Sequence, residues 1–125
     1  MEPSVIRDCT DDMDISSTEI FGPVIACYSF FSVEEVLDRA NNTEYGIQSY
    51  LYSKDIRRAN YIASKLDFSM VSINSSFPAT TKAPFSGRKA SGFVVEGSHE
   101  GLDEYLVSKS IYFNISITND VLARL

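Results

Sequence analysis

Hydrophobic residues between positions 24 and 74 fall into three short runs, each of which predicts a β-strand. The run Val24–Phe31 is almost continuously apolar or aromatic, which is typical of a strand covered on both faces. The runs Ile47–Tyr52 and Met70–Asn74 are shorter and rich in residues that suit a pleated surface. We therefore expect three strands, with the first of them fully buried.

The segments between these runs carry the periodicity of amphipathic helices. Ser32–Glu35 has the pattern of a capping box, and a second helix is predicted to begin after Ser53 or Asp55. Apolar residues line one side of each helix: Val33, Val36, Leu37 and Ala40 in the first, and Ile56, Ala59, Ile62, Ala63 and Leu66 in the second. Strands alternating with helices over short connections predict an α/β fold, a three-layer unit with a parallel sheet built by right-handed crossovers.

The regions on either side of this unit are less regular. The first fifteen residues predict a brief strand, 4–7, followed by an acidic turn, and residues 75–92 predict a long irregular loop of the kind that often carries function. A short helix over 98–107 and an alternating strand over 110–117 complete the pattern. The last strand has no later element to pair with, so we expect it to recruit another chain. We therefore divide the chain into an α/β domain segment, 1–107, a strand region, 108–118, and a tail, 119–125.

The composition is that of one globular domain and argues against several classes of partner. Eleven Lys and Arg residues against 17 Asp and Glu give 125 residues a net charge of −6, which disfavours nucleic-acid binding. No apolar stretch reaches the roughly 20 residues that cross a bilayer, and residues 1–4 lack the features of a signal peptide. We therefore expect a cytoplasmic protein without nucleic-acid or membrane partners.

Cysteine and histidine are too few for the commonest catalytic and metal sites. Cys9 lies among acidic residues, and Cys27 lies in the first apolar run, where we expect it to be buried. Neither sequence context favours a reactive thiolate. His99 is the single histidine, so no Cys/His metal site is predicted.

Four separate segments resemble one enzyme family. They are Glu19–Pro23, Ala40–Gly46, Ile73–Asn74 and Pro84–Gly92. Their order and spacing resemble the C-terminal quarter of NAD(P)-dependent aldehyde dehydrogenases, and the resemblance spans about residues 3–117. Within that family, residues 96–98 and 101–106 are most similar to the succinate-semialdehyde dehydrogenase branch. Ser86 stands where the family usually has a second glycine, and Val94 or Val95 lies where an arginine is common, so the substrate-side loop departs from the family pattern.

The resemblance implies a role for individual residues. It implies that Glu19 accepts hydrogen bonds from the nicotinamide-side ribose hydroxyls and that Phe21 packs beside the nicotinamide ring. It also implies that Phe85 forms part of the aldehyde tunnel, that Thr80 or Thr81 offers a hydroxyl to a substrate carboxylate, and that Ser110–Ile117 is an oligomerisation strand. Without the motif context, Glu19 would be read as a first-turn helix carboxylate and Phe21 as a core residue. Arg88 and Lys89 are predicted to be solvated loop charges.

In the family, most groups that the reaction requires lie N-terminal to the region that this chain resembles. Aldehyde oxidation needs a cysteine thiolate, oxyanion donors, a glutamate base and a domain that holds NAD or NADP. We therefore expect no catalytic residues and no dehydrogenase activity from this chain alone, which would bind the cofactor only in part. Three hypotheses follow. The chain is a C-terminal piece of an aldehyde dehydrogenase, or a subunit that completes a site in trans with a larger companion dehydrogenase chain, or a non-catalytic interaction module. In the third case its C-terminal strand would assemble with a second copy, as a homo-oligomer, or with a full-length relative.

Overall fold

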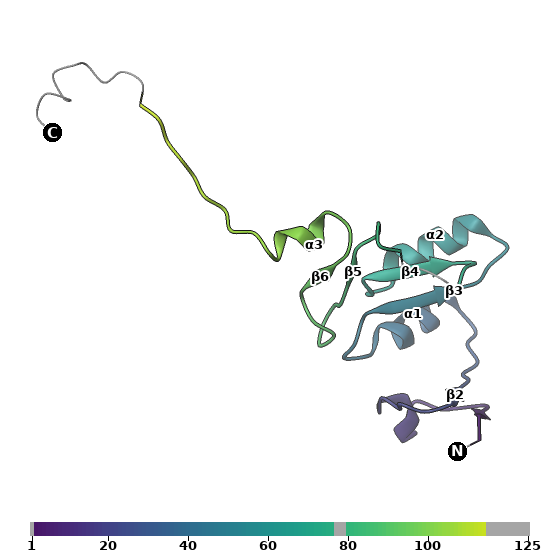
Figure 1. Cartoon of the computed structure of the whole chain (residues 1–125). Helices are drawn as coiled ribbons and strands as arrows, with labels where there is room; N and C mark the ends of the chain where they lie inside the picture. The colour runs from purple at the N-terminus through teal and green to yellow at the C-terminus, as the bar shows by residue number, and fades with distance from the viewer. Residues whose placement is uncertain (1, 77–79, 115–125) are drawn as a thin grey trace, which may run out of the picture.

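The computed structural model describes residues 2–76 and 80–114 as an α/β fold with parallel strand pairs (Figure 1). In chain order its elements are β1 (Ser4–Ile6), η1 (Asp14–Ser16, a 3-10 helix), β2 (Val24–Ala26), α1 (Val33–Asn41), β3 (Gln48–Leu51), α2 (Ile56–Lys65), β4 (Met70–Ile73), β5 (Phe85–Ser86), β6 (Val95–Glu96) and α3 (Glu100–Asp103). The pairs β1–β2 and β3–β4 are parallel, so the predicted α/β class is confirmed. Among the described residues, no helix has the length and apolar character to span a bilayer.

The unit from α1 to β4 follows the predicted pattern closely. Gln48 pairs with Met70 and Leu51 with Ile73, and α2 forms the crossover between these parallel strands. Asp55 caps α2 by accepting hydrogen bonds from the amides of Arg57 and Arg58, at 3.0 and 3.1 Å. These contacts set the start of α2 and therefore the length of the crossover.

The start of α1 is fixed by the capping box that the sequence predicts. The Glu35 amide donates to the Ser32 hydroxyl at 3.0 Å, and the Glu35 carboxylate accepts from the Phe31 amide at 2.7 Å. The helices α1 and α2 contact each other, and α2 also contacts β4. The buried apolar side chains Leu37, Ala59 and Ile62 come from these two helices and mark the core of the unit.

The first predicted strand is shorter and more exposed than expected. Only Val24–Ala26 forms β2, and Ile25 is 61% exposed, so the prediction of a strand covered on both faces is wrong for this chain. β2 pairs with β1, and the β1–β2 pair lies apart from β3–β4 (Figure 1). Because no other described strand joins this pair, its apolar side chains have little to pack against.

The two cysteines differ in burial, and the prediction that Cys27 is buried is wrong. Cys9 is buried and Cys27 is exposed. The Cys9 amide donates to the Cys27 carbonyl at 3.0 Å, and the Cys9 thiol lies 3.5 Å from the Ile6 carbonyl oxygen. Cys9 therefore lies against the backbone at the ends of β1 and β2, whereas Cys27, which directly follows β2, is exposed.

The region after β6 is less regular than the sequence predicts. Of the helix expected over 98–107, only α3 forms, because a helix this short gains little unless its apolar side chains are buried, and Leu102, Tyr105 and Leu106 are exposed. Beyond α3 the described chain runs away from the remainder (Figure 1). Residues 110–114 form no strand within the described chain, and residues 115–125 lie outside the described residues. The oligomerisation strand stays a prediction, since its partner would be another chain.

Candidate functional site

Two of the motif segments that are distant in sequence are joined by backbone hydrogen bonds. The Arg88 amide donates to the Gly46 carbonyl at 3.1 Å, and the Ala90 amide donates to the Glu44 carbonyl at 2.9 Å. The Gly46 amide in turn donates to the Ser91 hydroxyl at 3.0 Å. A Cβ at position 46 would lie 2.8 Å from the Asp67 carbonyl oxygen, so only glycine permits this close approach. The loop 84–92 is therefore held against the end of α1 rather than free in solvent.

Lys89 fastens the same loop to the C-terminal end of α1. Its ammonium group donates to the carbonyls of Asn41 and Thr43, at 2.9 and 3.1 Å, and lies 3.5 Å from a carboxylate oxygen of Asp67. It also lies 5.8 Å from the centroid of the Phe68 ring. A cation here complements the unpaired carbonyls and the negative end of the helix dipole.

The prediction that both basic residues of this loop are solvated is wrong for Lys89. The Lys89 side chain is only 23% exposed, whereas that of Arg88 is 57% exposed and forms an ion pair with Asp67 at 2.7 Å. The sequence alone gives no sign of this difference, because the carbonyls that bind Lys89 lie 46 and 48 residues away.

Two asparagines of the motif segments each bind a distant backbone through both side-chain atoms. Asn74 accepts from the Ser53 amide at 2.8 Å and donates to the Ser53 carbonyl at 2.9 Å. Asn41 accepts from the Asp67 amide at 2.8 Å and donates to the Lys65 carbonyl at 2.9 Å. Both residues belong to the recognised motifs, but the sequence did not reveal these positioning roles.

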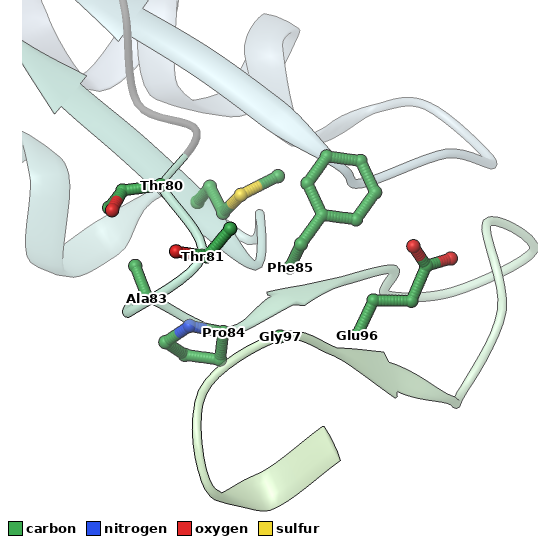
Figure 2. A pocket seen from close by; sticks show the side chains of 8 residues that line it. Thr80, Thr81, Ala83, Pro84, Phe85, Glu96 and Gly97 are labelled. Atoms are coloured by element: carbon green, nitrogen blue, oxygen red, sulfur yellow. The ribbon is translucent and has the colours of Figure 1, made fainter. Parts of the chain in front are cut away.

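A pocket of about 290 Å³ lies beside the β5–β6 ribbon (Figure 2). Three predicted substrate residues, Thr80, Thr81 and Phe85, all line it, together with Met70, Ala83, Pro84, Glu96 and Gly97. The Ser98 amide donates to the Thr81 carbonyl at 3.0 Å, which joins the loop before β5 to the turn after β6. The structure therefore brings the three predicted residues into one cavity.

Glu96 was not assigned a role from the sequence, although it lies in a segment that resembles the family. It faces Phe85 across the antiparallel β5–β6 register. Only knowledge of this strand pairing reveals that a carboxylate stands beside the aromatic ring. Glu96 is thus the pocket residue that sequence reasoning missed.

The two predicted cofactor residues lie elsewhere on the chain. Glu19 and Phe21 fall between η1 and β2, both are exposed, and neither lines the β5–β6 pocket. Phe21 is 96% exposed, so its ring is available to a neighbour. The structure therefore does not bring the predicted cofactor residues together with the predicted substrate residues in one cavity.

A wider hollow of about 1180 Å³ lies between the η1–β2 region and α1. Arg39 of α1 spans it: its guanidinium binds Asp11 at 2.8 Å and Glu35 at 3.4 Å, and donates to the Ser29 carbonyl at 3.0 Å. The guanidinium also lies 5.6 Å from the centre of the Tyr28 ring. These contacts link the N-terminal strand pair to α1. No group of three or more His, Cys, Asp or Glu side chains suited to a metal ion occurs in the part of the chain that the structure describes.

Comparison with models of protein families identifies the family of this chain. The model of the aldehyde dehydrogenase family matches residues 1–111. This chain belongs to the aldehyde dehydrogenase family. The family assignment made from the four motif segments is therefore confirmed.

Individual aldehyde dehydrogenases match this chain over part of their own length. Betaine aldehyde dehydrogenase of Bacillus subtilis is 41% identical over 113 residues, which are 90% of this chain and 23% of that protein. The structure of betaine aldehyde dehydrogenase from Staphylococcus aureus in complex with NAD+ is 42% identical, with a TM-score of 0.83, over 86% of this chain and 22% of that one. Succinate-semialdehyde dehydrogenase from Burkholderia pseudomallei is 44% identical, with a TM-score of 0.82, over 85% and 22%.

These comparisons establish the family but not a branch within it. Betaine aldehyde and succinate-semialdehyde dehydrogenases match at similar identity, so the succinate-semialdehyde branch is not singled out. The chain spans about a quarter of the length of the aldehyde dehydrogenases it matches.

Proposed function

We propose that this chain supplies the ribose-binding and substrate-facing surfaces of an NAD(P)-dependent aldehyde dehydrogenase. The observation that carries the proposal is the shared pocket of Thr80, Thr81 and Phe85, the three residues assigned to substrate from the family pattern. The loop that bears Phe85 is fixed to Gly46 and to the end of α1 by hydrogen bonds. A wall held in this way can orient an aldehyde toward reacting groups supplied by another part of the enzyme.

Glu19 and Phe21 fit one half of a nicotinamide cofactor. Glu19 is exposed and makes no ion pair with another described residue, so both carboxylate oxygens can accept hydrogen bonds from ribose hydroxyls. The exposed ring of Phe21 offers an apolar surface to the nicotinamide. The bound cofactor would accept hydride from the substrate. We infer partial cofactor binding, by NAD or NADP, with the remaining contacts made outside residues 1–125.

The chain alone is proposed to lack dehydrogenase activity. Cys9 is buried against the Ile6 carbonyl, and Cys27, although exposed, does not line the β5–β6 pocket. Covalent aldehyde oxidation needs a thiolate held next to the aldehyde carbon. Without such a group at the pocket, the residues present can bind and orient a substrate but cannot oxidise it.

Exposed apolar side chains in several parts of the chain support a role in assembly. Phe31, Phe93, Tyr112 and Phe113 are among the large apolar side chains that are exposed in the described chain. Surfaces of this kind mark interaction sites. We propose that they are covered in a complete dehydrogenase, either by a larger companion chain that carries the nucleophile or by a second copy, with residues 110–117 as the pairing strand.

The substrate is proposed to be an aldehyde with a polar or charged end. A carboxylate-bearing semialdehyde is one candidate, because the Thr80 or Thr81 hydroxyl can donate to its carboxylate. A cationic aldehyde is the other candidate, because Glu96 and Phe85 line the same pocket. The two candidates predict opposite responses to a change at Glu96.

A chimeric enzyme tests the proposed function. Residues 1–111 of this chain would replace the matching segment of the Staphylococcus aureus betaine aldehyde dehydrogenase, and NAD(P)H formation would be measured with several aldehydes. We expect activity from the chimera and none from the 125-residue chain alone. Activity of the isolated chain, or a folded but inactive chimera, would contradict the proposal.

Replacing Glu19 in the active chimera isolates its cofactor role. Glu19→Gln should raise the KM for NAD+ about tenfold, because hydrogen bonds to a charged acceptor are worth about 1.5–3 kcal/mol. Glu2→Gln, at another exposed carboxylate, is the matched control and should leave the KM unchanged. Equal KM values for the two variants would remove Glu19 from the site.

A further inference from the structure

The two cysteines of the chain meet at the ends of the β1–β2 pair, although they lie far apart in the sequence. The Cys9 amide donates to the Cys27 carbonyl at 3.0 Å, and the Cys27 amide donates to the Ile6 carbonyl at 2.8 Å. The Cys9 thiol also lies 3.5 Å from the Ile6 carbonyl oxygen. The Cys9 sulfur and the Cys27 backbone nitrogen therefore contact one and the same oxygen atom.

A bend at Asp8 brings Cys9 to the residue that follows β2. The φ of Asp8 is 56°, in the left-handed region that aspartate adopts more readily than most residues. The chain therefore leaves β1 at Ile6, bends and returns to Cys27. Backbones joined by such a hydrogen bond lie about 5 Å apart, and the Cα atoms of a disulfide are about 4.4–6.8 Å apart. The backbone separation thus suits a bridge between the two residues.

We propose that Cys9 and Cys27 form a reversible disulfide, with a small-molecule disulfide as the oxidant. Cys27 is exposed and reacts first, whereas Cys9 is buried and reacts second. The Cys27 thiolate attacks one sulfur of the oxidant, which gives a mixed disulfide and releases one thiolate. The Cys9 thiolate then attacks the Cys27 sulfur and releases the second thiolate. The two cysteines lose two electrons and two protons in all, and the oxidant leaves as two thiols.

The bridge would close the loop 10–26, which contains η1, Glu19 and Phe21. In the reduced chain the ends of this loop are held by a strand pair of only three residues on each side, and short pairs of this kind open easily. A cross-link lowers the conformational entropy of the opened loop and so disfavours its opening. The redox state therefore controls how often the loop opens. The bridge does not depend on the function proposed above, so either proposal can fail while the other stands.

Equilibration of the 125-residue chain with 2-mercaptoethanol and its disulfide tests the bridge. Both reagents are uncharged, so the acidic residues that follow Cys9 neither attract nor repel them. Acid quenching and mass spectrometry count the reduced, mixed and bridged forms, in native buffer and in concentrated urea. We expect the equilibrium constant for bridging to be about thirtyfold larger in the native chain, because the fold holds the two backbones together.

Peptide mapping and hydrogen exchange locate the bridge. Trypsin cuts after Arg7 and Arg39 and leaves both cysteines in one peptide, which a glutamate-specific protease cuts after Glu19, between them. The two cysteine-containing fragments of the oxidised chain should stay joined until the disulfide is reduced. Hydrogen exchange at the Cys9 and Cys27 amides should be about tenfold slower in the bridged form than in the reduced form.

Single-cysteine variants test the order of the two steps. Cys9→Ala should stop at a mixed disulfide on Cys27, and Cys27→Ala should leave Cys9 almost unmodified, because that thiol is buried. Equal reaction rates of the two variants would overturn the assigned order. The bridge itself is overturned if its equilibrium constant is no larger in the native chain than in urea, if the native chain stops at the mixed disulfide, or if the disulfide joins two chains. The measurement on the native chain requires neither variant to fold.

Discussion

Replacing Lys89 by methionine tests whether the loop 84–92 is fixed by a single ammonium group. Methionine keeps an unbranched side chain of similar length but removes the positive charge and all hydrogen-bond donors. The native ammonium binds two carbonyls at 2.9 and 3.1 Å and lies 3.5 Å from Asp67. The change therefore leaves the backbone hydrogen bonds intact while removing every polar contact of the side chain.

The size of the effect follows from these contacts. Hydrogen bonds that involve a charged group contribute about 1.5–3 kcal/mol each when well buried. Lys89 is partly exposed, the freed carbonyls can bind water, and fixing a lysine side chain costs up to about 2 kcal/mol of conformational entropy. We therefore expect Lys89→Met to lower the free energy of unfolding by about 2 kcal/mol, rather than by the sum of the separate contacts.

Urea unfolding followed by circular dichroism measures this loss. With a slope of about 2 kcal/mol per molar urea, the midpoint should fall by about 1 M. Lys54→Met is the matched control, because Lys54 is exposed and forms no ion pair with a described residue. Its midpoint should stay within about 0.25 M of the native value, as for most surface changes.

Equal midpoints for the two variants would refute the reasoning. That result would mean that the Lys89 contacts contribute no net stability and that the loop is held by its backbone hydrogen bonds alone. It would also restore the view of Lys89 as a solvated charge. A loss in both variants would instead indicate a general effect of removing positive charge from a chain with a net charge of −6.

Two further predictions concern single side chains. Asn74→Ala should lower the free energy of unfolding by about 2 kcal/mol, because it removes both hydrogen bonds to Ser53 and leaves alanine at a φ of 53°. Glycine tolerates that φ, so Asn74→Gly should show the loss of the hydrogen bonds without the backbone strain. The hydrogen bond from the Thr10 hydroxyl, with one from the Asp12 backbone amide, holds the pKa of Asp12 below its ordinary value of 3.8. Since the folded-state pKa of Asp12 is lowered, its ionised carboxylate stabilises the fold above pH 3.8, and this stabilisation is lost as the pH falls through the folded-state pKa. Thr10→Val should raise that pKa in an NMR titration of the Asp12 carboxyl carbon.

The sequence predicted the elements whose determinants are local. The start of α1 follows from Ser32 and Glu35, and the start of α2 follows from Asp55, because capping and periodicity depend on residues within one or two turns. The strands β3 and β4 were found for the same reason. Burial is not local, and the apolar run from Val24 was therefore read as a covered strand although the described chain supplies only β1 beside it.

The candidate site was only partly accessible from the sequence. Thr80, Thr81 and Phe85 were assigned from the family pattern, and their meeting in one pocket depends on the pairing of β5 with β6. Glu96 could not be linked to Phe85 before that register was known. The binding of Lys89 to the end of α1 was missed because it joins residues almost fifty positions apart.

The hydrogen bond between Gly46 and Ser91 also bears on the order of folding events. It joins residues 45 positions apart, whereas the Ser69 hydroxyl reaches the Ile47 carbonyl across 22 positions within the β3–α2–β4 crossover. Closing the longer loop costs more chain entropy, so the crossover should assemble before the 84–92 segment docks. Contacts that form late mainly slow unfolding, and Ser91→Ala should accordingly shorten the lifetime of the native state while leaving its rate of formation almost unchanged.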